Sequence, residues 1–178
     1  MSFFSKRRTI RLSQHRTADS PFGPIRISYN PGLLTVIALV QGPGMPSVTV
    51  VPGRDRGAMS INGQVIPTRR GNDGRWALRR RTRTRTALLG ERTYELRPTS
   101  LRRARLLRNG THIAEARGTL RSYASLRDIP GLDARLSWSH GLDPTDVAIG
   151  QSMVLAFGAG APGALSSLAS FCLDVFGS

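Results

Sequence analysis

A chain of 178 residues is long enough for one domain with a substantial apolar core. Its 25 Arg and one Lys outnumber 11 acidic residues and give a net charge of +15, which attracts polyanions such as nucleic acid, anionic lipid head groups or an acidic partner. A basic surface kept for solubility is the alternative. The single cysteine, Cys172, excludes an intramolecular disulfide and a Cys-based zinc site, so we expect an intracellular setting.

The charge is distributed unevenly along the chain. Residues 1–142 hold all 26 basic residues against 8 acidic ones, whereas residues 143–178 hold three acidic residues and no basic one. Residues 1–8 predict a basic N-terminal arm, because no apolar segment follows their basic residues as it would in a signal peptide. Residues 9–178 are predicted to form a single domain.

Short alternating segments bounded by Gly and Pro predict a region of about ten short strands over residues 9–142. Residues 14–24 are expected to form a polar loop and residues 69–74 a turn. The expected strands are 9–13, 25–29, 33–40, 48–51, 60–66 (a hairpin), 76–86, 93–96, 103–107, 111–117, 119–126 and 133–138. The hairpin and the pair 103–107 and 111–117 turn at Asn-Gly, which supplies the two positive-φ residues of a type I′ turn.

From residue 143 onward, the sequence carries the signals of a helix in place of short strands. Asp143 is a candidate cap, Pro144 suits the first helical position, and the segment Val147–Phe157 is apolar all round apart from Gln151 and Ser152. Because a helix of that kind is buried, residues 143–158 are predicted to form a core helix.

A second, amphipathic helix is expected over residues 162–176. The one-sided apolar face of Ala164–Phe176 is expected to lie across one end of the domain or to contact a protein partner. Gly and Pro between residues 158 and 163 divide the uncharged run, which disfavours a membrane-spanning helix. The predicted fold is mainly β with C-terminal helices: an antiparallel β-barrel or sandwich packed around a buried hydrophobic C-terminal helix.

Strands followed by a helix that is apolar on all sides resemble the tubby-like fold, shared by tubby, phospholipid scramblase and the LURP-one-related proteins. The segments Tyr94–Pro98 and Ala104–Gly110, followed by the apolar helix, look like bacterial members, and the resemblance covers residues 25–160. It implies a closed barrel threaded by the helix and a non-enzymatic domain, with phosphoinositide or anionic lipid binding in tubby itself. No individual binding residue is transferred by it, and the second helix departs from the pattern.

Arginine and threonine alternate near the middle of the chain, over Arg79–Thr86. In a strand, Arg81, Arg83 and Arg85 share one face at a spacing of about 6.6–6.8 Å, close to that of successive phosphates in an extended nucleic-acid strand. An exposed edge strand protected by its charge is the alternative. Trp76 is the one aromatic residue nearby, which favours binding to phosphate backbones or lipid heads over base stacking. The predicted anion-binding residues are Arg69, Arg70, Arg79, Arg80, Arg81, Arg83, Arg85, Arg103 and Arg105.

Catalytic, metal-binding and cofactor-binding patterns are not found, and His15, His112 and His140 lack metal-ligand spacing. We therefore expect a non-enzymatic basic domain without a cofactor that binds an anionic surface, most simply phospholipid head groups. Its expected location is the cytoplasm, including the inner face of the membrane. The alternative is a nucleic-acid-binding protein, or a component of a larger assembly in which the apolar tail docks into a partner.

Overall fold

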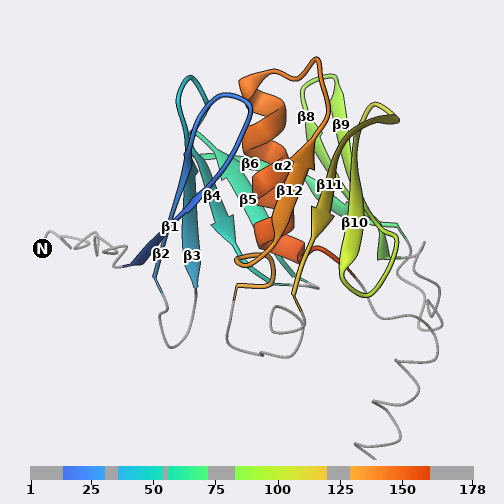
Figure 1. Cartoon of the computed structure of the whole chain (residues 1–178), viewed down its shortest axis with the longest axis horizontal. Helices are drawn as coiled ribbons and strands as arrows, with labels where there is room; N and C mark the ends of the chain where they lie inside the picture. The colour runs from blue at the N-terminus through green and yellow to red at the C-terminus, as the bar shows by residue number, and fades with distance from the viewer. Residues whose placement is uncertain (1–13, 31–35, 54–55, 72–82, 120–128, 161–178) are drawn as a thin grey trace, which may run out of the picture.

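The computed structural model describes residues 14–30, 36–53, 56–71, 83–119 and 129–160. Over these residues the chain is mainly β, with two antiparallel six-stranded sheets and one helix near the C-terminal end (Figure 1). The first sheet contains β1 (Gln14–Ala18), β2 (Ile25–Asn30), β3 (Ile37–Gln41), β4 (Val48–Val51), β5 (Ala58–Ile61) and β6 (Gln64–Ile66). The second sheet contains β7 (Thr68–Arg70), β8 (Arg85–Leu89), β9 (Arg92–Pro98), β10 (Arg103–Arg108), β11 (Thr111–Arg117) and β12 (Arg135–Trp138).

In both sheets, each strand pairs with the strand next to it in the sequence. Between β6 and β7 the chain passes from the first sheet to the second at Pro67, which has no backbone N–H for a ladder. Strands β1 and β12 are the terminal strands at the other side, and within the described ranges no backbone ladder joins them. The two sheets therefore do not close into a barrel through backbone pairing there.

Both predicted Asn-Gly hairpins are present. Asn62 and Gly63 have φ angles of 48° and 83° between β5 and β6, and Asn109 and Gly110 have φ angles of 49° and 81° between β10 and β11. Asparagine and glycine tolerate this left-handed region, so the turns form without the steric cost that other residues would incur.

The helix α2 (Pro144–Phe157) lies between the two sheets (Figure 1). Asp143 caps it, since its side chain accepts a hydrogen bond from the backbone N–H of Asp146, and the Asp146 side chain accepts one from the backbone N–H of Asp143. Every residue from Asp146 to Phe157 is buried. The sequence prediction of a capped, buried core helix is confirmed.

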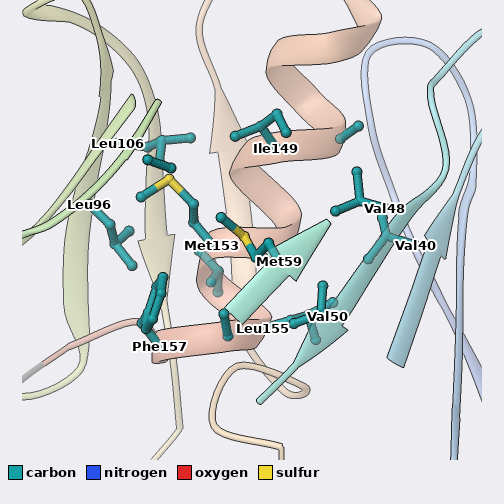
Figure 2. Packing of buried hydrophobic residues seen from close by; sticks show 14 of the residues in the cluster. Val40, Val48, Val50, Met59, Leu96, Leu106, Ile149, Met153, Leu155 and Phe157 are labelled. Carbon is teal, nitrogen blue, oxygen red and sulfur yellow. The ribbon is translucent and has the colours of Figure 1, made fainter. Parts of the chain in front are cut away.

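The apolar core consists of the helix and the inner faces of both sheets. Figure 2 shows Leu96 and Leu106 on one side of α2 and Val40, Val48 and Val50 on the other. Burying each such side chain contributes roughly 1.5–3 kcal/mol. The helix therefore supplies the apolar surface against which both sheets are folded.

Close contact between the helix and β10 and β12 depends on Gly150. A Cβ atom at this position would lie 2.4 Å from Leu106 Cδ2 and 3.1 Å from Trp138 Cη2. A side chain at position 150 would require the Leu106 side chain to shift or α2 to move away from the second sheet.

Several sequence expectations are corrected. Residues 14–18 form β1 and not part of a polar loop, and residues 69 and 70, expected at the start of a turn, belong to β7. The described residues contain twelve strands, against about ten expected. The basic arm 1–8, the strand expected at 9–13, residues 120–126 of the strand expected at 119–126 and the helix at 162–176 lie outside the described residues. In the part of the chain that the structure describes, no helix is long and apolar enough to cross a membrane.

Candidate functional site

Arginine is concentrated in the second sheet. The strands of the first sheet carry Arg16 and Arg26. The strands of the second sheet carry Arg69, Arg70, Arg85, Arg92, Arg97, Arg103, Arg105, Arg108, Arg117 and Arg135. The positive charge of the described strands is thus displaced to one side of the domain.

Five of these arginines form what we call the outer arginine face, which comprises Arg97, Arg103, Arg105, Arg117 and Arg135. All five are exposed. Register places Arg103 opposite Arg117 and Arg117 opposite Arg135, so three arginines lie side by side across β10, β11 and β12. Arg105 lies opposite Arg97 of β9. The array therefore extends in two directions, along the strands and across them.

Two glutamates accompany the outer arginine face. Glu95 lies 2.7 Å from Arg97, and Glu115 lies 3.9 Å from Arg103. Such exposed pairs contribute little free energy, about 0–1 kcal/mol each, so they hold these arginines only weakly. Among the described residues no ion pair is formed by Arg105, Arg117 or Arg135. Most of the positive charge on this face is available to an anion.

The arginines predicted from the Arg-Thr run are arranged differently from the prediction. Arg79, Arg80 and Arg81 lie outside the described residues. Arg83 is partly buried, and Arg85 is only 8% exposed, with its guanidinium carbon 5.4 Å from the centre of the Phe157 ring. The expectation that Arg85 belongs to an exposed anion-binding face is wrong, because its side chain faces the helix.

The alternative of an exposed edge strand is also wrong for Arg85 and Thr86, whereas residues 79–82 lie outside the described residues. Strand β8 pairs with β7 on one side and with β9 on the other. Arg69 of β7 is exposed and Arg70 is partly buried. The other predicted pair, Arg103 and Arg105, belongs to the outer arginine face, and it is there that the structure brings predicted residues together.

Replacing Arg85 with glutamine should lower the free energy of unfolding by about 1–2 kcal/mol, since the cation–π contact with Phe157 is lost. Urea unfolding followed by circular dichroism measures the change. The exposed Arg105→Gln is the matched control and should change stability by less than about 0.5 kcal/mol. An Arg85→Gln protein of unchanged stability would contradict the inward placement.

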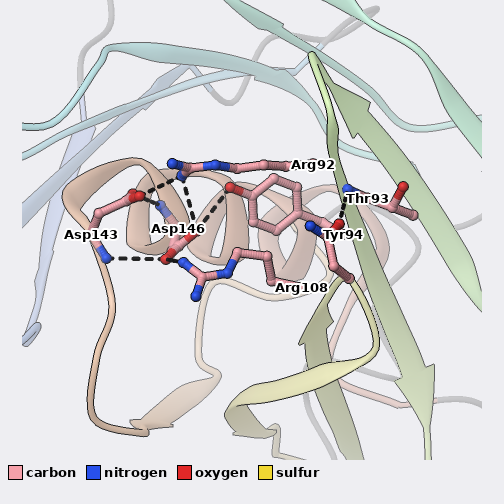
Figure 3. Close-up of polar contacts among 7 residues, drawn as sticks. Arg92, Thr93, Tyr94, Arg108, Asp143 and Asp146 are labelled. Carbon is pink, nitrogen blue, oxygen red and sulfur yellow. Dashed lines mark hydrogen bonds and ion pairs between the residues drawn. The ribbon is translucent and has the colours of Figure 1, made fainter.

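A second polar group lies at the start of α2, and we call it the helix-cap cluster: Arg92, Tyr94, Arg108, Asp143 and Asp146 (Figure 3). The Asp146 carboxylate is fully buried. It accepts hydrogen bonds from the Tyr94 hydroxyl at 2.9 Å, from the Arg108 guanidinium and from the backbone N–H of Asp143 at 3.0 Å. Arg92 pairs with Asp143 and lies 3.4 Å from Asp146.

Burial raises the pKa of Tyr94 to about 12, so its hydroxyl remains a donor at neutral pH. Burial alone would raise the pKa of Asp143, but the backbone N–H of Asp146 and the Arg92 guanidinium together hold it below its usual value. A carboxyl whose pKa is depressed by folding stabilises the folded state above its unfolded pKa, about 3.9, and loses that effect as the pH falls through the folded value. The helix-cap cluster therefore fixes α2 to β9 and β10 at neutral pH.

Sequence reasoning missed the contributions of Arg97, Arg117 and Arg135 to the outer arginine face, and those of Arg92, Tyr94 and Arg108 to the helix-cap cluster. Because side chains alternate between the two faces of a strand, the sequence alone places Arg97 on the same face of its strand as Glu95, two residues earlier. The sequence signal for a helix cap at Asp143 predicted only where the helix begins. No sequence signal linked Asp146 to strands about 40–50 residues earlier.

The chain matches no protein-family model, no curated protein and no solved structure. The resemblance to the tubby-like fold stays a prediction. Fold and site define a two-sheet β domain with a buried helix and an arginine array on the outside of one sheet.

Proposed function

We propose that the chain is a non-enzymatic binding domain whose outer arginine face binds anionic phospholipid head groups at a membrane surface. The observation that carries the proposal is the array itself, in which Arg103, Arg117 and Arg135 lie side by side and Arg97 and Arg105 form a second row. Paired residues on neighbouring strands lie about 5 Å apart, and same-face residues along a strand lie about 6.6–6.8 Å apart. A two-dimensional array of guanidinium groups suits a surface that carries many phosphates in a plane.

Nucleic acid is the less favoured partner for this surface. Proteins that bind single strands combine basic grooves with exposed aromatic side chains on which bases stack. In the described ranges, Val65 is the one large apolar side chain that is strongly exposed, at 71%, and no aromatic residue is. The outer arginine face thus offers charge without a stacking platform.

The proposal extends to fold and location. We infer that the two sheets and α2 act as one barrel-like unit of the tubby-like kind, for which the sequential strand order and the enclosed helix give support. A domain of this charge would lie in the cytoplasm and be held at the inner face of the membrane, where anionic lipids attract basic surfaces.

The double variant Arg105→Gln/Arg117→Gln should bind vesicles containing phosphatidylserine about 30-fold more weakly than the unmodified chain. Each arginine near an anionic surface contributes about 1 kcal/mol, and about 1.4 kcal/mol corresponds to a tenfold change. Co-sedimentation with vesicles of phosphatidylcholine, with and without phosphatidylserine, measures the affinity. The matched control is Arg26→Gln/Arg56→Gln, which removes the same charge from exposed positions outside the second sheet.

The control should bind within about threefold of the unmodified chain, because charge on another face adds only a screened long-range term. Equal losses in the two double variants would show attraction by net charge alone and contradict the proposed face. Binding assays with duplex DNA and single-stranded RNA at the same ionic strengths belong to the same test. Tighter binding to either nucleic acid, lost through the same two substitutions, would favour the nucleic-acid alternative.

A further inference from the structure

A mainly polar groove of about 940 Å³ lies between the terminal strands of the two sheets, and we call it the seam groove. Strand β1 and the segment around β12 form its walls, and α2 contributes Gln151. The Arg16 guanidinium crosses the groove to Asp133, at 2.5 Å. The groove is large enough for a ligand of several residues or a small molecule.

Gln151 is the unusual member of this groove. The residue is only 2% exposed and lines the groove, and it is not among the described residues whose enclosed polar side-chain atoms lack a partner. The neighbouring Ser152 is also buried, but it donates a hydrogen bond to the carbonyl of Ala148 at 2.6 Å. Because its amide can both donate and accept hydrogen bonds, Gln151 offers a polar contact to a ligand in the groove.

Among the described strands, those that form the walls of the groove also have backbone groups outside any ladder. β1 pairs with β2 alone and β12 with β11 alone, so one edge of each strand has no ladder partner in the described ranges. Unpaired strand edges accept an added strand, which then gains backbone hydrogen bonds. Four consecutive residues of β1 are exposed, Gln14 to Thr17, as at a sheet edge that lacks a neighbour.

The charges at the seam groove differ from those of the outer arginine face. Its lining contains Arg16 and Arg135 together with Asp19 and Asp133. Because both signs are present and Arg16 already pairs with Asp133, the groove has no preference for a polyanion. Backbone amides, which donate and accept without net charge, match this lining best.

We propose that the seam groove binds an extended peptide segment of a partner protein, which adds as a strand between β1 and β12. The lengths of these strands, 5 and 4 residues, set the length of the bound segment. One of its side chains points inward and is a hydroxyl or an amide, because these groups satisfy the donor and the acceptor of Gln151. This binding goes beyond the membrane attachment proposed above, and the seam groove shares only Arg135 with the outer arginine face.

The test is selection of random seven-residue peptides displayed on phage against the full chain, with washes in about 0.5 M salt to remove peptides held by the net charge. Enriched peptides should share Ser, Thr, Asn or Gln at one position. Synthetic copies, titrated by fluorescence anisotropy, should bind the Gln151→Leu variant at least about tenfold more weakly, which corresponds to about 1.4 kcal/mol.

Gln151→Leu should stay folded, since it keeps the side-chain volume and leaves no polar side-chain atom at this position. Methylation of alternate backbone nitrogens in the peptide should abolish binding, because it removes the ladder donors. That result separates strand addition from binding through side chains alone.

Failure to enrich any peptide above a resin control would overturn the proposal. Equal binding by the unmodified chain and Gln151→Leu, or full binding by the methylated peptide, would do the same. A dimer that forms in the unmodified chain and is lost in Gln151→Leu, measured by light scattering, would show that a second copy occupies the groove and not a partner. Loss of vesicle binding leaves these readouts unchanged, so the two proposals fail separately.

Discussion

Val154→Asp is expected to unfold the domain. Val154 is fully buried in α2, which lies between the two sheets, so a carboxylate at this position has no access to water (Figure 1). An uncompensated buried charge destabilises a fold by several kcal/mol, and the lost apolar contacts add to that. Since a domain is stable by about 5–15 kcal/mol, most of the molecules should lose their cooperative thermal transition, measured by circular dichroism.

The chain offers a matched control for this substitution at Val65, which is 71% exposed on β6. Val65→Asp makes the same chemical change on the surface and should alter stability by less than about 0.5 kcal/mol. If Val154→Asp retained a cooperative transition and lost only binding to vesicles or a partner, α2 would not be the core of this domain.

Asp146→Asn is expected to lower the free energy of unfolding by about 3 kcal/mol. The substitution keeps the shape of the side chain but removes the negative charge that Arg92 and Arg108 share (Figure 3). Breaking a buried ion pair is unfavourable by about 3–5 kcal/mol, and the lower value applies because the Arg92 and Arg108 side chains are 41% and 28% exposed and regain water.

Urea unfolding measures this loss, and Asp133→Asn is the control. Asp133 pairs with Arg16 at 2.5 Å, but both side chains are substantially exposed, at 35% and 52%. Removing an exposed pair should change stability by less than about 1 kcal/mol. Equal effects of the two substitutions would mean that Asp146 is not held by the helix-cap cluster.

Local chemistry explains which parts of the fold are predictable. The Asn-Gly pairs at residues 62–63 and 109–110 allow the left-handed conformation of a two-residue turn, so both hairpins follow from the sequence. Asp143 and Pro144 likewise mark the start of α2, and the apolar run after them predicts its burial. Each of these signals acts within a few residues of the chain.

The arrangement of the outer arginine face depends on a shift in the register of β10 and β11, which the Asn-Gly turn between them does not predict. A regular hairpin through Asn109–Gly110 would place Arg103 opposite Ala116. A register shift between Leu106 and Leu107 places it opposite Arg117 instead, because an extra residue is accommodated in β11. The bulge is visible in β11 as two adjacent buried residues, Ile113 and Ala114, which interrupt the alternation of buried and exposed residues.

Arg85 shows how a repeated pattern misleads. The Arg-Thr alternation suggests that Arg81, Arg83 and Arg85 act as one exposed set. Strand β8, however, continues with the buried Ala87, and Arg85 is in phase with it. The inward position is tolerated because Phe157 offers its ring to the guanidinium, a contact between residues far apart in the sequence.

The enclosed helix follows all the described strands in the sequence, and this order has a consequence for the synthesis of the protein. All twelve described strands lie between residues 14 and 138, and the helix that fills the space between them lies at residues 144–157. A ribosome adds about 5–20 residues per second, so the inner apolar faces of both sheets are made seconds before their packing partner. Until residue 157 has emerged, the nascent chain exposes those faces to solvent, and chaperones that hold apolar strands would act in this interval.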